Sequence, residues 1–457
     1  MMKGYLTIFL SLSLSLLIGF VLLLTGGAIR NGEKVRFESV VDVSMNATLA
    51  EYHIGLLEKY DLFYIDTSYL DSEPSKENLE NRLSYYLKAN MDPPWGRLVT
   101  EDVEIGLLET AAANGGASIR SQAVAYILNY GEPTARQWKV LDQMEELRSL
   151  EAKDPMAGFH ALMEQLAGME LPKVQNEEGV WEEVPLSNPA DIVYALVGSD
   201  IFYLAEADLG MAGTVSIRPE EYVSHRQIQN TGSMDREFLR DEGAFLAYLF
   251  EKMGYLKNPA DSKLLKCQLE YVACGKASDL ENVRVVGERL FRWRFADNLS
   301  CALADGGLRE QAEAAASILQ AVQLQEALKE PVVQSILYAC AFLESVNDMR
   351  VLYQGGEVPV RKESHGMSVA HVLSGSRYRA DTGEGLSYKE YLAGMLLLLD
   401  EEKLNLRVMD IMEMEMRLLD GNPHFAMDWC VERYDVKISA VNHFGDKWVI
   451  NRRYGYY

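Results

Sequence analysis

Residues 4–29 read GYLTIFLSLSLSLLIGFVLLLTGGAI and contain no charged side chain. At about 1.5 Å per residue, a helix of this length crosses the roughly 30 Å hydrocarbon layer of a bilayer. Lys3 precedes the run and Arg30 follows it, a pattern typical of a targeting or anchoring segment rather than of a buried core helix. The sequence therefore predicts a transmembrane anchor at residues 1–30.

A cleavable signal peptide is the alternative, because Gly26 and Ala28 have the small-x-small spacing of a cleavage site. The apolar run is much longer than the ~7–15 residues of a signal-peptide core, and its length favours an uncleaved anchor. Flanking charge does not decide the orientation. Lys3 lies on one side and Arg30 and Lys34 lie on the other, and a long C-terminal region is exported largely regardless of such charges.

A helical pattern of apolar residues continues beyond the anchor. No proline interrupts residues 4–60, so a single helix of ~55 residues would be about 80 Å long. We expect its first half to be the anchor and its second half to be the spine of the exported part, with a first strand completing residues 31–70. The apolar face of the second half consists of Val40, Val43, Ala47, Ala50, Ile54 and Leu57.

The overall composition is that of a globular protein. Of the 457 residues, 48% are hydrophobic and 25% are charged, which excludes a largely disordered chain, a collagen and a small disulfide scaffold. Lys and Arg number 44 whereas Asp and Glu number 68, so the net charge is −24. Because this charge repels phosphate groups, we expect no nucleic-acid partner.

The rest of the chain is expected to be α+β. Residues 71–180 are predicted to form a helical subdomain that ends in a linker at 171–190, where Pro, Asn and acidic residues gather. Residues 181–457 are predicted to form an α+β head with an antiparallel sheet. Within this head, alternating residues predict short strands in 191–225 and a strand at 264–274.

Helix and hairpin signals complete the predicted head. Ser278-x-x-Glu281 and Ser387-x-x-Glu390 are capping boxes, and the first is expected to open a helix that ends near Ala304. Polar and apolar residues alternate in the last segment, residues 434–457, which predicts a C-terminal β-hairpin. The other helices are expected at 308–328 and at 332–353 after a break at Pro331. Two more are expected near the end of the chain, one that begins at Ser387 and contains residues 396–399, and one that follows it to about Leu419.

The N-terminus resembles that of pilin-like proteins. The pair Lys3-Gly4 precedes an aromatic residue and an apolar helix, whose outer half becomes the spine of the globular head in that family. Type IV prepilins carry a glutamate five residues after the glycine, whereas this chain has Phe9 and departs from the prepilin pattern.

A closer resemblance is to the TadE- and TadG-like proteins of tight-adherence (Flp) pilus systems, and to a large uncharacterised Gram-positive family with the same start. It implies a single membrane span, an exported C-terminal region and association with a pilus system. It carries over no assigned activity, and it favours an extracytoplasmic head. The matching segments are residues 3–4, 27–30, 41–46, 49–53, 56–69, 264–271, 275–276, 278–279, 281–282, 344–348 and 385–388.

The cysteine and histidine patterns predict no disulfide framework, metal site or cofactor. The five cysteines are odd in number and include no Cys-x-x-Cys pair. No two of the seven histidines have the i, i+4 spacing of a helical zinc site. Cys267 and Cys274 are expected to face opposite sides of the strand at 264–274, and Cys340 to be a small core residue.

The nearest approach to a hydrolase site is the polar loop that contains His365 and His371. The chain has no Gly-x-Ser-x-Gly elbow, so a polar surface loop is the favoured interpretation and we assign no catalytic residue. The serines of this loop are Ser364, Ser368, Ser374 and Ser376.

These observations lead to a hypothesis about function. The chain is expected to be a non-enzymatic, membrane-anchored and exported component of a Tad-like pilus or secretion apparatus, acting as a pseudopilin-like, assembly or surface scaffold protein. Its expected partners are the membrane and other pilus or secretion-system proteins. The alternative is a membrane-anchored envelope enzyme or ligand-binding module, such as a hydrolase that uses the loop at 364–376.

Two further features bear on partners. The 24 tyrosines against 14 phenylalanines are an interface-like composition, which ordinary half-buried rings explain equally well. Ser11 and Ser15, with Gly4 and Gly19, are candidates for a helix–helix face in the bilayer, and lipid-facing small residues are an equally good interpretation.

Overall fold

The chain divides into two units, each assembled from segments that are distant in sequence. The computed structural model describes residues 2–70, 72–91, 98–132, 137–228, 237–363, 366, 368–374, 384–442 and 444–456. Unit 1 consists of Met1–Tyr126, Glu220–Arg240 and Val408–Tyr457, and unit 2 consists of Ile127–Pro219 and Asp241–Arg407. The fold is α+β, as the sequence predicts, with one long N-terminal helix and small antiparallel sheets.

Helix α1 (Met2–Leu49) is continuous through the apolar run and beyond it. Among the described residues it is the one helix long and apolar enough to cross a membrane by length and composition. The expected continuation to residue 60 is wrong, because a second helix, α2 (Ile54–Tyr60), begins after a break. His53 causes the new start: its Nδ1 accepts a hydrogen bond from the Leu56 backbone N–H at 3.1 Å.

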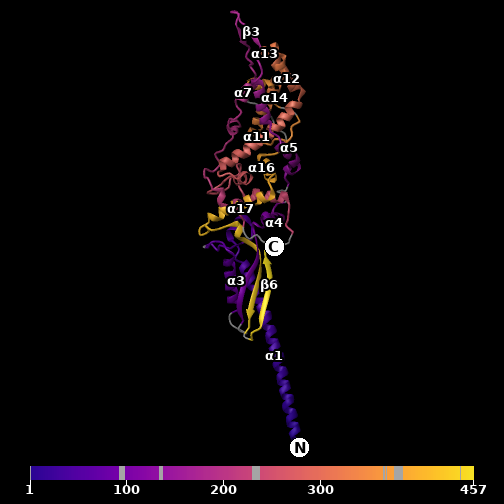
Figure 1. Ribbon diagram of the computed structural model, residues 1–457, viewed down its shortest axis with the longest axis vertical. Helices are drawn as coiled ribbons and strands as arrows, with labels where there is room; N and C mark the ends of the chain where they lie inside the picture. The colour runs from indigo at the N-terminus through magenta and orange to yellow at the C-terminus, as the bar shows by residue number, and fades with distance from the viewer. Residues whose placement is uncertain are drawn as a thin grey trace. The chain divides into compact units, whose positions relative to one another are not determined.

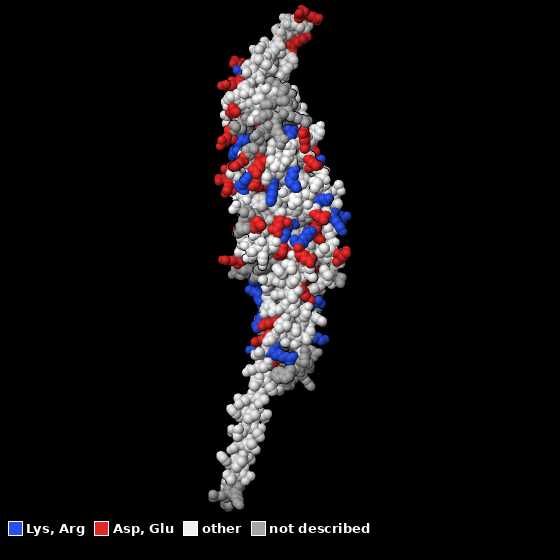
Figure 2. Space-filling model, turned by 180° about the vertical axis from the view of Figure 1, so that it is seen from behind, with Lys and Arg blue, Asp and Glu red and all other residues white. Residues whose placement is uncertain are grey.

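The two halves of α1 have opposite surroundings. In the first half, the large apolar side chains are between 52% and 75% exposed. In the second half, Phe37, Val41 and Met45 are fully buried. Figure 2 shows the first half as a stalk without charged surface.

A four-stranded antiparallel sheet is the centre of unit 1. Strand β5 (Cys430–Val441) pairs with β2 (Val99–Thr110) and with β6 (Lys447–Gly455), and its start also pairs with the short strand β1 (Ile65–Asp66). The predicted C-terminal hairpin is thereby confirmed, with Ile438 opposite Ile450.

Strand β2 corrects the prediction that residues 71–180 are a helical subdomain. In β2, Ile105 and Leu108 are buried in the core, whereas Glu101, Asp102 and Glu104 are exposed. Register shifts between Thr100 and Asp102 and between Ile105 and Leu108 interrupt the alternation, so the strand has no clean period of two for the sequence to reveal.

One face of the sheet is covered by helices. The second half of α1 and α3 (Lys76–Met91) pack together and against the strands (Figure 1). The resulting core joins residues from both ends of the chain, which explains why unit 1 is discontinuous. Its members include Phe37, Val41, Met45, Leu79, Leu83, Leu87, Ile105, Leu108, Val431, Tyr434, Val436, Ile438 and Ile450.

The segment 220–240 is tied into unit 1 by ion pairs. Arg226 donates to Glu413 Oε2 at 2.8 Å and to Asp428 Oδ1 at 2.5 Å. Glu413 lies in α17 (Glu401–Arg417), which crosses a sequence boundary between the units, as does α4 (Ala113–Tyr130).

Unit 2 is mainly helical. Its two longest helices, α11 (Asp279–Ala304) and α14 (Lys329–Tyr353), pack against each other. Its other elements are β3 (Lys173–Gln175), β4 (Trp181–Glu183), α5 (Met144–Glu151), α6 (Pro155–Ala167), α7 (Ala190–Tyr194), α8 (Ile201–Leu204), α9 (Glu242–Lys252), α10 (Gln268–Cys274), α12 (Gly306–Ser317), α13 (Gln320–Leu324), α15 (Val369–Ser374) and α16 (Tyr388–Leu397).

Both predicted helix starts are confirmed, and one of the two capping boxes is complete. Ser278 accepts from the Glu281 backbone N–H at the start of α11. Ser387 and Glu390 form the complete reciprocal box at the start of α16. Pro331 lies in the first turn of α14, where a missing N–H costs nothing, so it marks a helix start rather than a break.

Four predictions for unit 2 are wrong. The single helix expected at 308–328 is divided into α12, α13 and a short 3-10 helix at Glu326–Leu328. The strand expected at 264–274 is helix α10, in which both faces are buried, so the polar alternation of Gln268 and Glu270 does not mark an exposed face. The short strands expected in 191–225 are α7, α8 and turns, with Ser216 in an isolated bridge. The linker expected at 171–190 contains the two-stranded sheet of β3 and β4.

Candidate functional site

The serine–histidine loop of the sequence analysis stays a prediction. Ser364, His365 and Ser376 lie outside the described residues. His371 and Ser374 lie in α15, but their side chains are not among those described. The structure therefore brings no catalytic pair together in the part of this loop that it describes.

The cysteines do not have the surroundings of nucleophiles. Cys267 and Cys274 do not alternate on a strand, since they flank and end helix α10. Burial raises the pKa of the Cys274 thiol to about 12, and burial likewise raises the pKa of Cys340 to about 12. Both side chains are therefore neutral thiols near pH 7, the unreactive form.

The described residues also contain no group of three or more His, Cys, Asp or Glu side chains placed to hold a metal ion.

The candidate site is the surface around the hairpin of β3 and β4 in unit 2, which we call the acidic hairpin surface. It comprises residues 163–194. The two strands pair in a three-residue register, with Gln175 opposite Trp181. A hairpin this short has little stability of its own.

The turn of this hairpin is held by one asparagine. Asn176 Oδ1 accepts hydrogen bonds from the backbone N–H groups of Glu178 at 3.0 Å and Val180 at 2.9 Å. Gly179 has a φ of 81°, in the left-handed region that glycine adopts without strain. The turn therefore fixes the conformation of a hairpin that packs against little else.

Apolar side chains on the hairpin are open to solvent. Trp181 is 65% exposed on one face of the hairpin, and Val174 and Val180 are exposed on the other face. Exposed large apolar groups that gather in one place mark interaction surfaces. Tryptophan is also the residue type most enriched among those that dominate binding energy.

A pocket of about 640 Å³ adjoins the hairpin. Its apolar wall comes from the end of α6, with Met163 and Leu166. Its other wall comes from the chain after β4 and from α7, where Tyr194 packs edge-on against Phe159 at 5.1 Å between ring centroids. The pocket is thus lined by apolar groups on both sides and also by the carboxylates of Glu164, Glu170, Glu183 and Asp191.

Nearly all the charged side chains of this surface are acidic. Residues 163–194 contain one basic side chain, Lys173, which pairs with Glu183 at 3.2 Å. Figure 2 shows acidic side chains gathered at the end of unit 2 that carries β3 (Figure 1). Such a surface attracts a partner with basic groups around an apolar contact. The seven carboxylates are Glu164, Glu170, Glu177, Glu178, Glu182, Glu183 and Asp191.

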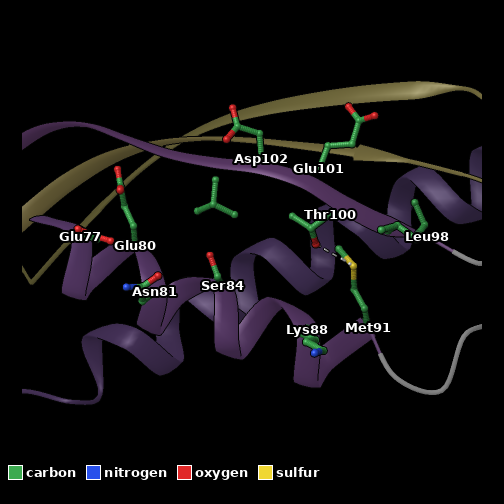
Figure 3. A pocket seen from close by; sticks show the side chains of 12 residues that line it. Glu77, Glu80, Asn81, Ser84, Lys88, Met91, Leu98, Thr100, Glu101 and Asp102 are labelled. Atoms are coloured by element: carbon green, nitrogen blue, oxygen red, sulfur yellow. Dashed lines mark hydrogen bonds between the residues drawn. The ribbon is translucent and has the colours of Figure 1, made fainter.

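A second pocket, of about 750 Å³, lies between α3 and β2 in unit 1 (Figure 3). Two of the polar groups that line it are committed to the fold. Glu80 Oε1 accepts from the Ile105 backbone N–H at 2.9 Å, and Thr100 Oγ1 donates to Met91 Sδ at 3.4 Å. Figure 3 shows Glu101 and Asp102 directed away from the groove. This groove is therefore the weaker candidate for a binding site.

A buried ionic cluster lies in the core of unit 2. Arg294 of α11 is fully buried and donates to Asp297 Oδ2 at 2.9 Å and to Asp348 Oδ2 at 3.0 Å. Lys362 donates to Asp348 Oδ1 and to Glu344 Oε1, both at 2.6 Å. Burial alone would raise the pKa of Asp348, but these two cations hold it below its usual value. The cluster ties α11, α14 and the chain after Val360 together.

Glu270 of α10 is a buried carboxylate with a different environment. It accepts hydrogen bonds from the Leu256 backbone N–H at 2.8 Å and the Tyr388 hydroxyl at 2.9 Å. Burial raises its pKa to about 7, because neutral donors offset only part of the desolvation cost.

Neither the buried ionic cluster, nor the buried Glu270, nor the acidic hairpin surface was predicted from the sequence. Residues 344–348 carried a family resemblance without an assigned role, and the structure places Glu344 and Asp348 in the ionic cluster. The signal for the hairpin was the run Asn176-Glu-Glu-Gly179 between apolar residues, a four-residue turn pattern.

Comparison with known proteins gives one family match. The model of a family described as "Family of unknown function (DUF5702)" matches residues 179–441, which is more than half of the chain and covers β4 and most of unit 2. No curated protein and no solved structure matches the chain.

Proposed function

We propose that this chain, which belongs to the family of unknown function DUF5702, is a non-enzymatic, membrane-anchored and exported component of a Tad-like pilus or secretion apparatus. The observation that carries the proposal is helix α1. Its first half exposes a continuous apolar surface, and its second half is buried in the core of unit 1. Burying the exposed half requires an apolar environment outside the chain, and a bilayer supplies one.

The polar side chains of the apolar half support this assignment. Ser15 Oγ donates to the Ser11 carbonyl oxygen at 2.8 Å, and Thr25 Oγ1 donates to the Val21 carbonyl oxygen at 2.7 Å. Ser11 makes a similar bond to the Ile8 carbonyl oxygen at 2.9 Å. These hydroxyl donors are satisfied within the helix, so the segment presents no unpaired donor at these positions to the hydrocarbon.

The pilus context is supported by the sequence resemblance and by the arrangement of unit 1. The residues at 3–4, 27–30 and 41–46 resemble those of TadE- and TadG-like proteins. The second half of α1 packs into the core of unit 1, in agreement with the spine helix that the pilin-like resemblance implies. The continuous helix joins the anchor rigidly to unit 1, so a force on that unit passes directly to the membrane segment.

The mechanism is one of attachment and display. The anchor holds the chain in the membrane with both units outside the cell, and the acidic hairpin surface of unit 2 binds another protein of the apparatus. Trp181 supplies the apolar contact and the surrounding carboxylates select a partner with basic groups.

A site-specific cross-linking experiment tests the proposal. In native cells, p-benzoylphenylalanine in place of Trp181 is expected to form adducts with a pilus or secretion-system protein on illumination. The same amino acid in place of Tyr203, which is also highly exposed in unit 2 but lies outside this surface, is the matched control. Adducts that are equal at both positions, or a chain that stays monomeric at both, contradict the proposal.

A further inference from the structure

One asparagine holds the described residues of the turn between β5 and β6, which are Asn442 and residues 444–446. Asn442 Oδ1 accepts hydrogen bonds from the backbone N–H groups of Phe444 at 2.9 Å and Asp446 at 2.8 Å. Gly445 has a φ of 83°, in the left-handed region that glycine adopts without strain. These contacts fix the backbone at Phe444.

This turn is attached to α1 directly after the apolar run. Arg30 Nε pairs with Asp446 Oδ2 at 2.9 Å, and its guanidinium lies 5.7 Å from the centre of the Phe444 ring. One helical turn further, the fully buried Glu33 accepts a hydrogen bond from Asn442 Nδ2 at 2.7 Å. The three contacts hold the turn at the level of Arg30 along the helix.

The depth of Phe444 follows from this attachment. Arg30 is the first charged residue after the apolar run, so an anchor formed by that run places its guanidinium among the lipid headgroups. Phe444 then lies at the same depth, and 49% of its surface is open. Val99 pairs with Val441 beside the turn and is exposed as well.

We propose that the β5–β6 turn is a second membrane contact, in which the Phe444 ring inserts at the boundary between the headgroups and the hydrocarbon of the bilayer that α1 crosses. The inference rests on the proposed membrane anchor. Aromatic rings favour this boundary, and a nearby arginine can pair with lipid phosphate there. A single membrane helix leaves unit 1 free to rotate about the helix axis relative to the membrane. A second contact through the turn fixes that rotation.

A lipid partner fits this surface better than a second protein because Phe444 lies beside Arg30, directly after the last residue of the apolar run. The aromatic ring and its basic neighbour suit a boundary with an apolar side and a charged side.

The test uses the full chain in vesicles of phosphatidylglycerol that contain an alkyne-tagged phosphatidylglycerol. p-Benzoylphenylalanine replaces Phe444 in one variant, Leu107 in a second and Phe20 in a third. Leu107 is the matched control, because it is exposed to a similar degree but lies between the partners of Val436 and Tyr434 on β5, roughly 20 Å from the turn. Phe20 lies within the proposed anchor.

The expected result is tagged lipid adducts at positions 444 and 20, each severalfold above the yield at position 107. Adducts at 20 with equal yields at 444 and 107 overturn the inference and leave the anchor intact. Protein adducts at 444 without lipid also overturn it. A yield at position 20 no higher than at 107 overturns the anchor itself, and the inference falls with it.

Discussion

The apolar half of α1 and the helix pair α11 and α14 depart from ordinary burial in opposite directions. Leu16 in α1 is 75% exposed, whereas Arg294 in α11 and Asp348 in α14 are fully buried. A continuous exposed apolar surface and a buried charge are both informative, whereas single exposed apolar residues are common and need no explanation. Both are unfavourable unless other groups compensate for them. The two regions differ in where the compensating groups lie.

The ionic cluster is balanced from within unit 2. Arg294 and Lys362 lie against Asp297, Asp348 and Glu344 at hydrogen-bond distance. The exposed surface of α1 has no such internal partner in the residues that the structure describes. The difference indicates that α11 and α14 serve the stability of unit 2, whereas the first half of α1 serves a contact outside the chain.

The largest effect is expected from placing charges in the exposed half of α1. The double variant Leu16→Arg/Leu17→Arg should lose membrane association, because each arginine near the centre of a span costs about 2.5–3.5 kcal/mol of insertion free energy. Membrane sedimentation of the full chain measures this. Asn46→Arg, on an exposed position of the other half, is the control that should still sediment; a double variant that sediments equally well contradicts the account.

The next effect concerns the ionic cluster. Asp348→Ala leaves Arg294 and Lys362 without their shared carboxylate, and we expect the free energy of unfolding of unit 2 to fall by about 3–5 kcal/mol. Denaturant titration of the full chain in detergent, followed by tryptophan fluorescence, measures the loss. Glu330→Ala removes the exposed pair with Arg309 and should cost no more than about 1 kcal/mol. Equal losses would remove the distinction between the two.

A comparable loss is expected from the buried half of α1. Phe37→Ala empties a fully buried position in the core of unit 1, which should lower the free energy of unfolding by about 3–5 kcal/mol. Val35→Ala, two residues earlier and 61% exposed, should change it by no more than about 0.5 kcal/mol. The same titration compares them, and a similar cost for both would mean that the second half of α1 is not a packed spine.

The smallest effect is expected at Glu270, a buried carboxylate that has no cation beside it in the described part of the chain, in contrast to Asp348 of the ionic cluster. Because the pKa of Glu270 is raised from its usual 4.5 to about 7, the folded state binds more protons than the unfolded state between these values. The stability of the wild type should therefore fall as pH rises from about 4.5 to 7, by about 2–3 kcal/mol from this group.

Glu270→Gln keeps a carbonyl acceptor for Tyr388 and should remove this part of the pH dependence. Unfolding at pH 5 and pH 8 measures it, with Glu288→Gln on the exposed face of α11 as the control. A variant whose stability falls with pH as steeply as that of the wild type would show that Glu270 does not carry this dependence.

Parts of the fold were predictable because their signals are local. The apolar run of α1 is charge-free, the pairs Ser278–Glu281 and Ser387–Glu390 mark helix starts, and the C-terminal hairpin alternates cleanly. Each of these depends on residues within a few positions of one another.

The errors have physical causes that a local pattern does not contain. Strand β2 is hidden by its bulges, and α10 alternates polar and apolar residues although Gln268 and Glu270 are buried with partners. The ionic cluster joins Arg294 to Asp348, 54 positions apart. Residues 171–190 were interpreted as a linker because most of them are polar, and the turn pattern at Asn176 to Gly179 was overlooked; the structure pairs Lys173–Gln175 with Trp181–Glu183.

The most direct test of the central claim follows the full chain in native cells. After alkaline carbonate extraction, the chain is expected to remain in the membrane pellet at full length, and protease added to intact protoplasts is expected to digest everything beyond Arg30. Release of a shortened chain into the medium would identify residues 4–29 as a cleaved signal peptide. A pelleted chain that the protease leaves intact would place both units inside the cell and contradict the account.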